Sequence, residues 1–185
     1  MCYLIFIILY LLAVALNLLS TLKQKEKLFA ITKPLLMLLL ALYCVFREFP
    51  FPDRLLLGAL LACWLGDVLL IPKGNRWLTV GGLAFLAGHI LFILNFAKRI
   101  DLHQLPLPVL IPVALLYLLA GGFVMARIWK QVPWPLRIPM AGYLLCNAVT
   151  NLFALTWLLD VPGLWPAVAY AGSLLFFLSD SVLLL

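Results

Sequence analysis

The chain contains seven long apolar runs, separated by short clusters of charged residues and prolines. A helix needs about 20 apolar residues to cross roughly 30 Å of hydrocarbon. The runs lie at about 3–20, 33–46, 55–71, 77–97, 109–126, 138–158 and 166–185, the second being short unless it extends. With 66% hydrophobic and 11% charged residues, the chain has too few polar residues to cover a soluble globule. The pattern therefore predicts an all-α membrane protein, a polytopic bundle of transmembrane helices.

The two ends of the chain affect the predicted number of helices. The run at 3–20 is long for a signal peptide and is followed, not preceded, by lysines, so we expect it to remain as a helix. The chain stops at Leu185 inside an apolar run with no flanking charge, so we expect an eighth helix to be missing at the C-terminus. The sequence has no low-complexity segment and no long linker, which predicts a single transmembrane helical domain over residues 1–185.

The positions of lysine and arginine predict the orientation in the membrane. Cytoplasmic loops carry an excess of these residues. If the N-terminus is outside, only Arg47, Arg54, Lys98 and Arg99 lie at the outer ends of the runs. The inner ends then hold Lys23, Lys25, Lys27, Lys33, Lys73, Arg76, Arg127, Lys130 and Arg137. We therefore expect a multi-pass protein, in the cytoplasmic membrane if the source is bacterial, and the net charge of +6 requires no nucleic-acid partner.

Two aspartates lie in similar apolar segments, LGDVLLI at 65–71 and LSDSVLLL at 178–185. Asp67 follows the start of its run by about 12 residues and Asp180 by about 14, which places both roughly 18–21 Å from the outer boundary. A charged residue in mid-membrane costs about 2.5–3.5 kcal/mol on insertion scales. Because no lysine or arginine lies deep in a predicted span to neutralise them, we interpret both aspartates as functional residues.

Small and polar residues accompany the aspartates at helical spacing, which predicts that four helices face one interior. On the run at 55–71, Ala59, Cys63 and Asp67 share one line. The other three predicted faces hold Gly81, Gly82, Phe85, Gly88 and His89; Tyr143, Asn147, Thr150 and Asn151; and Ala169, Gly172, Ser173, Phe176 and Asp180.

Several of these residues have a structural interpretation beside the functional one. His89 can simply hydrogen-bond a neighbouring helix, and Asn147 and Asn151 can join helices. Lys33 can be a helix-end lysine that reaches the boundary, with Pro34 in the first helical turn, or it can bind a phosphate together with Lys73 and Arg76. A zinc site needs three or four protein ligands. The runs offer one histidine and no CxxC pair, so we expect no metal and no cofactor.

A pair of carboxyl groups in an apolar interior predicts acid–base chemistry. Two like charges close together cannot both ionise cheaply, so the protonated member can act as an acid and the ionised member as a base. The alternative is a small proton-coupled transporter whose carboxylates bind and release protons within the membrane. A non-catalytic scaffold would leave the two aspartates without a role.

Five segments resemble, in order and spacing, the YhhN-like family of integral membrane proteins, which includes the lysoplasmalogenases. They are TKPLLM (32–37), LGDVLLI (65–71), GGLAFLAGHILFI (81–93), NAVTNLFAL (147–155) and AGSLLFFLSDSVLLL (171–185). The resemblance implies an eight-helix enzyme without metal or cofactor. Such an enzyme hydrolyses the vinyl ether bond of lysoplasmalogens to a fatty aldehyde and a glycerophospho-ethanolamine or glycerophosphocholine.

The resemblance also implies site residues. The aspartates of its GD and SD motifs, the candidate catalytic pair, match Asp67 and Asp180, and its KP, GH and TN motifs match positions 33–34, 88–89 and 150–151. With the polar face of the run at 138–158, the expected substrate-binding residues are Lys33, His89, Tyr143, Asn147 and Asn151. The expected partners are a lysophospholipid substrate and membrane lipids, while the oligomeric state is left open.

Overall fold

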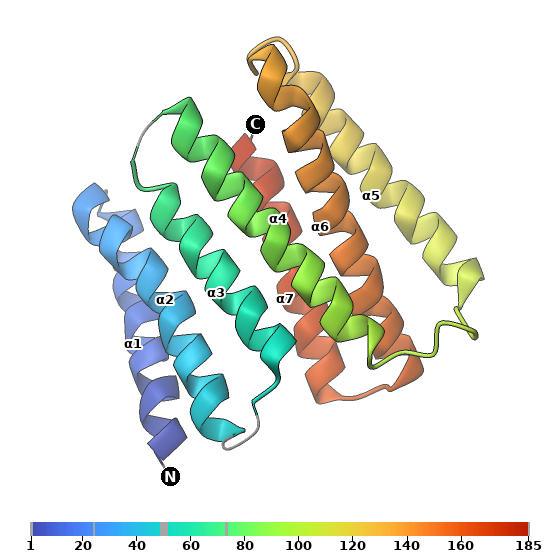
Figure 1. Ribbon diagram of the computed structural model, residues 1–185, viewed down its shortest axis with the longest axis horizontal. Coiled ribbons are helices and arrows are strands. Elements are labelled where there is room, and N and C mark those ends of the chain that lie inside the picture. Colours follow the sequence, from blue (N-terminus) through green and yellow to red (C-terminus); the bar gives the residue numbers. More distant parts are fainter. Residues whose placement is uncertain (1, 24, 49–51, 73, 185) are drawn as a thin grey trace. The chain divides into compact units, whose positions relative to one another are not determined.

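The computed structural model describes residues 2–23, 25–48, 52–72 and 74–184, which form seven helices along the seven apolar runs (Figure 1). The helices are α1 (Cys2–Leu22), α2 (Glu26–Arg47), α3 (Arg54–Leu69), α4 (Asn75–Ala97), α5 (Leu107–Ile128), α6 (Trp134–Asp160) and α7 (Leu164–Leu184). The prediction of an all-helical protein is confirmed for this part of the chain.

The prediction of seven membrane spans is confirmed only in part. Five helices in the described part of the chain are long and apolar enough to cross a membrane: α1, α2, α4, α5 and α6. Helix α3 has 16 residues, which is shorter than the bilayer core requires. Helix α7 has 21 residues and is apolar over most of its length, but it is not among these five. The chain is a membrane protein, and the number of its spans beyond these five stays a prediction.

Residues at the helix ends explain where several helices begin. The side chain of Asp53 accepts hydrogen bonds from the backbone N–H groups of Leu55 and Leu56, which caps the start of α3. Pro108 and Pro135 lie in the first turns of α5 and α6, where a missing N–H group has no helical partner to lose.

Helix α2 begins earlier than the sequence predicted. The apolar run was placed at 33–46, but the helix extends back to Glu26, so Lys33 and Pro34 lie in its interior. The interpretation of Pro34 as a first-turn residue is therefore wrong. The charges of Lys27 and Lys33 interrupt the apolar pattern, although their long aliphatic stems are compatible with a helix in the membrane.

The chain divides into two compact units, residues 1–91 and residues 92–185. Whether they form the single domain that the sequence predicts stays a prediction.

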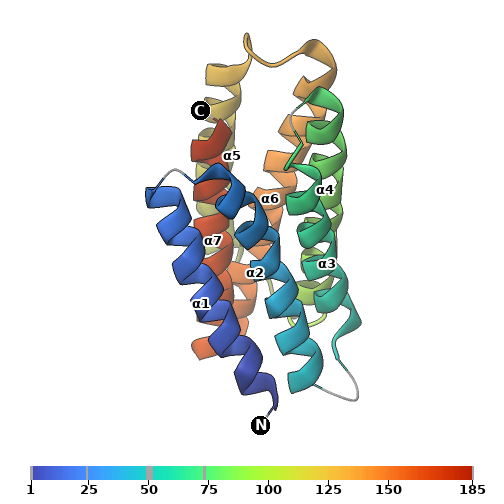
Figure 2. The same ribbon diagram turned by 90° about the vertical axis from the view of Figure 1, so that its left-hand side faces the viewer.

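In the first unit α2 packs against both α1 and α3, and Figure 2 shows α1 and α2 side by side. The Nδ2 group of Asn17 donates to Oγ1 of Thr32 at 2.9 Å, a polar contact that joins α1 to α2.

Glycines allow α3 and α4 to approach closely. A Cβ atom added at Gly66 would lie 2.6 Å from the ring of Phe85, and one added at Gly88 would lie 2.7 Å from Sγ of Cys63. Such distances are shorter than a van der Waals contact, so a larger residue at either position would push the helices apart. The predicted face of α3 is buried at Ala59, Cys63 and Asp67, and that of α4 is buried except at Gly82, which is partly exposed.

In the second unit α6 packs against α5 and α7. Tyr117 of α5 and Phe177 of α7 meet edge to face, with ring centroids 5.0 Å apart, and Ala148 of α6 completes the cluster. The face predicted for the last run is only partly correct. Gly172 is exposed and Phe177 is the buried residue, because the packed face of α7 includes Ser173 and lies about 100° from Gly172.

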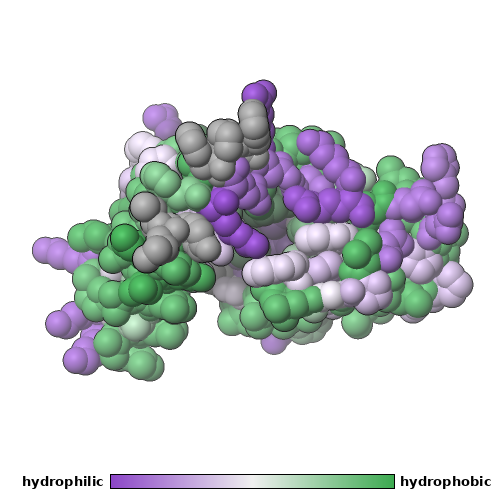
Figure 3. Space-filling model, turned by 90° about the horizontal axis from the view of Figure 1, so that it is seen from below, coloured by the Kyte–Doolittle hydropathy of each residue, from purple (hydrophilic) through white to green (hydrophobic). Residues whose placement is uncertain are grey.

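The surfaces of the helices are apolar, as expected beside lipid. Large apolar side chains are exposed along most of α1 and on the outer faces of the other helices. Figure 3 looks at one end of the helices, where many hydrophilic residues gather beside hydrophobic ones. This distribution suits helices whose ends reach water and whose sides contact hydrocarbon.

Candidate active site

Asp67 lies near the end of α3 and is ion-paired. Its side chain is only 4% exposed, and Oδ1 lies 3.4 Å from Nζ of Lys33 on α2. The prediction that no cation is available to neutralise this aspartate is therefore wrong. Lys33 lies about two turns after the start of α2 at Glu26, and its ammonium group reaches α3.

The Lys33 side chain is 39% exposed, whereas Asp67 is buried. The ammonium group therefore has access to a second anion, while the carboxylate depends on the protein for its contacts. Because Lys33 is partly solvated and Asp67 is not, we expect the contribution of this pair to stability to lie between that of a surface ion pair and that of a fully buried one.

The small residues of α3 explain why Asp67 is buried. Ala59, Cys63 and Gly66 share its face and are buried with it, as the sequence predicted. Because α4 approaches α3 closely at Gly66, the Phe85 ring covers the residue next to Asp67. His89 is also buried and follows Gly88 on α4. Its contribution to a site with Asp67 stays a prediction.

Asp180 lies near the end of α7 and is held by two side chains of α6. The Tyr143 hydroxyl and the Nδ2 group of Asn147 both donate to Oδ2 of Asp180, the latter at 3.3 Å. Tyr143 and Asn147 are four residues apart on one helix, so they share a face one turn apart. The carboxylate is only partly buried, and these two donors fix its orientation.

Further hydrogen bonds extend this arrangement along α6. The Nδ2 group of Asn151 donates to the backbone oxygen of Asn147 at 3.0 Å and to its Oδ1 at 3.2 Å. Oδ1 of Asn151 in turn lies 3.3 Å from the Tyr117 hydroxyl of α5 and 3.1 Å from Oγ of Ser173 on α7. The second unit thus contains a polar chain that links three helices and ends at Asp180.

The structure brings most of the predicted site residues together in two clusters. Lys33 contacts Asp67 in the first unit, and Tyr143, Asn147 and Asn151 form the chain to Asp180 in the second. The pairing of Asp67 with Asp180 stays a prediction. Sequence analysis missed Tyr117 as a polar contact, although a tyrosine in the middle of an apolar run was a usable signal.

The other basic candidates for a phosphate lie near the α3–α4 connection. Arg76 is exposed in the first turn of α4, and Lys73 lies outside the described residues. Among the residues that the structure describes, no group of three or more His, Cys, Asp or Glu side chains is arranged to hold a metal ion.

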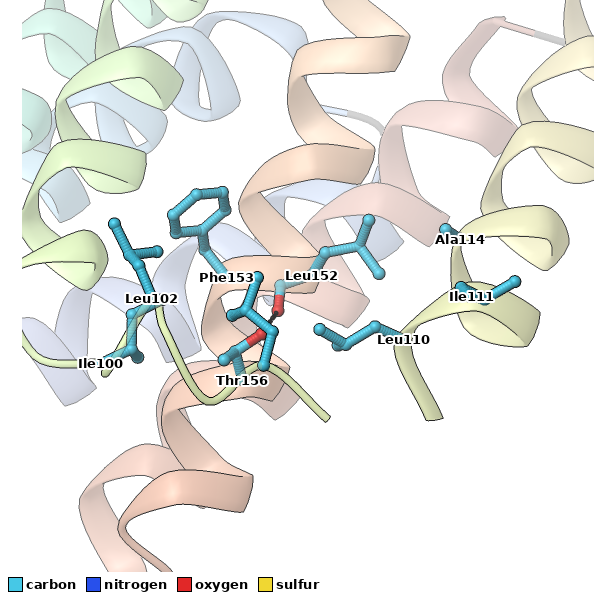
Figure 4. A pocket seen from close by; sticks show the side chains of 9 residues that line it. Ile100, Leu102, Leu110, Ile111, Ala114, Leu152, Phe153 and Thr156 are labelled. Atoms are coloured by element: carbon cyan, nitrogen blue, oxygen red, sulfur yellow. Dashed lines mark hydrogen bonds between the residues drawn. The ribbon is translucent and has the colours of Figure 1, made fainter. Parts of the chain in front are cut away.

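An apolar pocket of about 230 Å³ lies between α5, α6 and the segment before α5. Figure 4 shows Ile111 and Ala114 of α5 on one side of it, Leu152 and Phe153 of α6 on another, and Leu102 of the connecting segment nearby. Its one polar lining side chain, Thr156, donates to the Leu152 carbonyl of its own helix. The pocket can accept hydrocarbon, but its lining offers no group for acid–base chemistry.

Comparison with known proteins gives one match. Residues 28–185 match the YhhN family, a range that begins in α2 and includes both aspartates and all the residues of the two clusters. No protein with a curated description matches the chain, and no solved structure matches it.

Proposed function

We propose, from the premise that the chain belongs to the YhhN family, that it is a membrane-embedded hydrolase of lysoplasmalogens. It cleaves their vinyl ether bond to give a fatty aldehyde and a glycerophospho-ethanolamine or glycerophosphocholine. Asp67 and Asp180 form its acid–base pair. The observation that carries the proposal is the carboxylate of Asp180, which the donors Tyr143 and Asn147 hold in place within an apolar helical protein.

The chemistry of a vinyl ether suits a pair of carboxyl groups. A carboxylic acid gives its proton to the β-carbon of the double bond, which leaves an oxocarbenium ion at the α-carbon. A nearby carboxylate stabilises this cation and takes a proton from the attacking water. The resulting hemiacetal then breaks its bond to the glyceryl oxygen, which takes up a proton. The reaction consumes one water and requires neither a nucleophilic side chain nor a redox partner.

The membrane arrangement follows from the same proposal. We expect a multi-pass protein with both aspartates toward the inner side, so that a single-chain lipid reaches them from the inner leaflet. Its hydrocarbon chain stays among apolar helices and its phosphate lies at the boundary. Lys33 is the candidate phosphate ligand, because its side chain is partly exposed and lies 3.4 Å from Asp67.

Purified protein in detergent is expected to release aldehyde from a lysoplasmalogen, at a rate that EDTA and phenanthroline leave unchanged. Acid–base catalysis by carboxyl groups needs no metal, and hydrolysis needs no second compartment. The measurement is aldehyde formation with an alkenyl lysolipid and with its saturated ether analogue as the control. Proton-coupled transport requires two compartments, so proton uptake by vesicles without aldehyde release would favour the transporter. Inhibition by chelators that zinc reverses would contradict the metal-free mechanism.

Replacing Lys33 with alanine is expected to raise KM for the lysoplasmalogen roughly 10- to 100-fold. A charged hydrogen bond to a phosphate contributes about 1.5–3 kcal/mol, and because the phosphate does not react, this bond stabilises ground state and transition state alike. Lys27→Ala is the matched control, because Lys27 is an exposed lysine of the same helix.

A second substrate separates the two possible roles of Lys33. An alkenyl glycerol without phosphate should show the same KM with the parent and with Lys33→Ala. If the variant instead lowers kcat equally for both substrates, Lys33 serves only as the counter-ion of Asp67.

A further inference from the structure

The amide of Asn151 receives hydrogen bonds from two neighbouring helices at one end. Its side chain is fully buried on α6. The Tyr117 hydroxyl of α5 and Oγ of Ser173 on α7 both lie within hydrogen-bonding distance of its Oδ1. The Ser173 hydroxyl has one proton to donate, and a second acceptor, the backbone oxygen of Tyr170, lies 2.9 Å from its Oγ. Oδ1 of Asn151 has two lone pairs and can accept from both hydroxyls, while Ser173 shares its proton between two acceptors.

An asparagine amide has a direction, because one end only accepts and the other only donates. The backbone oxygen of Asn147 can only accept, so the Nδ2 group of Asn151 points toward it and Oδ1 of Asn151 faces the two hydroxyls. Oδ1 of Asn147 then accepts from Asn151, so its own Nδ2 group points to Asp180. If both amides were reversed, the oxygen of Asn147 would face the oxygen of Asp180, and the hydrogen bond would be replaced by repulsion.

We propose that Tyr117 and Ser173 are positioning residues for Asp180, which hold Asn151, and through it Asn147, with an N–H group directed at the carboxylate. This inference rests on the proposed function, because the orientation of Asp180 affects the reaction only if this carboxylate is catalytic. Tyr117 and Ser173 contact Asn151, which is two links away from the carboxylate. Their effect on catalysis is transmitted through Asn147.

The direction of the chain explains why the network uses amides and hydroxyls. A hydroxyl rotates and can donate or accept, so a chain made only of hydroxyls would have two directions of similar energy. Here the backbone oxygen of Asn147 and the carboxylate of Asp180 can only accept, so the two planar amides keep one direction. The hydroxyls of Tyr117 and Ser173 hold the far end of the chain at Oδ1 of Asn151. At the other end the Tyr143 hydroxyl and the Nδ2 group of Asn147 both donate to Oδ2 of Asp180.

The test is a mutant cycle that removes the hydroxyls and the link separately. Tyr117→Phe and Ser173→Ala should each lower kcat less than about threefold, since one remaining donor still orients Asn151. Together they should lower kcat roughly tenfold with KM unchanged, which corresponds to the loss of one hydrogen bond in the transition state. In an Asn147→Ala background the same double change should have no further effect on kcat. Thr156→Val is the control, because this buried hydroxyl of α6 bonds to its own helix.

Infrared spectroscopy provides a second readout that does not depend on activity. With ¹³C-labelled aspartate, the carboxyl bands that disappear in Asp180→Asn belong to Asp180. These bands should shift in the variant with both Tyr117→Phe and Ser173→Ala, and stay unchanged in Thr156→Val. If this double variant does not fold, the isosteric Asn151→Asp, which removes the donor to Asn147, should shift the same bands.

The outcomes separate the inference from the proposed function. Unshifted bands, or an equal loss of kcat in the Asn147→Ala background, would overturn the positioning role. Shifted bands in a protein that releases no aldehyde from any lysoplasmalogen would support the positioning of Asp180 while rejecting the hydrolase.

Discussion

Asp180→Asn is expected to give a folded protein whose kcat for lysoplasmalogen is lower by roughly 10²- to 10⁴-fold. This range is the usual contribution of a positioned acid or base, and an amide cannot transfer the proton. The substitution keeps the shape of the side chain and an oxygen that accepts from Tyr143 or Asn147. Where the carboxylate is ionised, its replacement also removes an insertion cost of about 2.5–3.5 kcal/mol. Aldehyde release and thermal unfolding of the purified variant are the two measurements.

The neighbouring residue provides a matched control. Ser181 is buried on the same helix and donates to the Phe177 carbonyl one turn before it. Ser181→Ala should lower stability by about 0.5–1.5 kcal/mol and leave kcat unchanged. Near-parental activity of Asp180→Asn would show that this carboxylate has no catalytic role, and failure of Asp180→Asn to fold would show that it is structural.

The helices of this protein could be predicted because a chain that crosses lipid must satisfy its backbone hydrogen bonds within itself, and a helix does so. Apolar runs of sufficient length leave the backbone no partner except itself, so all seven became helices. The start of α2 was predicted too late, because the charges of Lys27 and Lys33 are typical of the end of a membrane span. Their long aliphatic stems nevertheless allow the helix to include both residues.

The side-chain contacts could be predicted only where one helix determines them. Ala59, Cys63 and Asp67 share a face by their spacing alone, and Tyr143 and Asn147 lie one turn apart for the same reason. The Lys33–Asp67 pair depends on how α2 and α3 are shifted along each other, which spacing within each helix does not determine. The rotation of α7 is a similar case, because Phe177 is buried through its contact with another helix.

Asp67→Asn is expected to lower kcat as strongly as Asp180→Asn, by roughly 10²- to 10⁴-fold. If the two carboxyl groups act in one step, the variant with both substitutions should be little worse than either single one, because groups that work as a unit are strongly non-additive. Rates of aldehyde release for the three variants, measured in the same detergent, test this. Losses that multiply in the variant with both substitutions would show that the aspartates act independently.

Asp67→Asn could also be inactive because Lys33 loses its counter-ion. A second substitution separates this structural cause from a loss of catalysis. Asp67→Asn removes the counter-ion, but Lys33 is 39% exposed and can extend to the boundary, so we expect the variant to fold. Adding Lys33→Met removes the unpaired charge and keeps an apolar stem of similar length. If Asp67 serves only to neutralise Lys33, this variant should recover kcat for an alkenyl glycerol that carries no phosphate. If Asp67 is catalytic, the variant should be stable and still inactive, because no other group replaces the lost proton donor or acceptor.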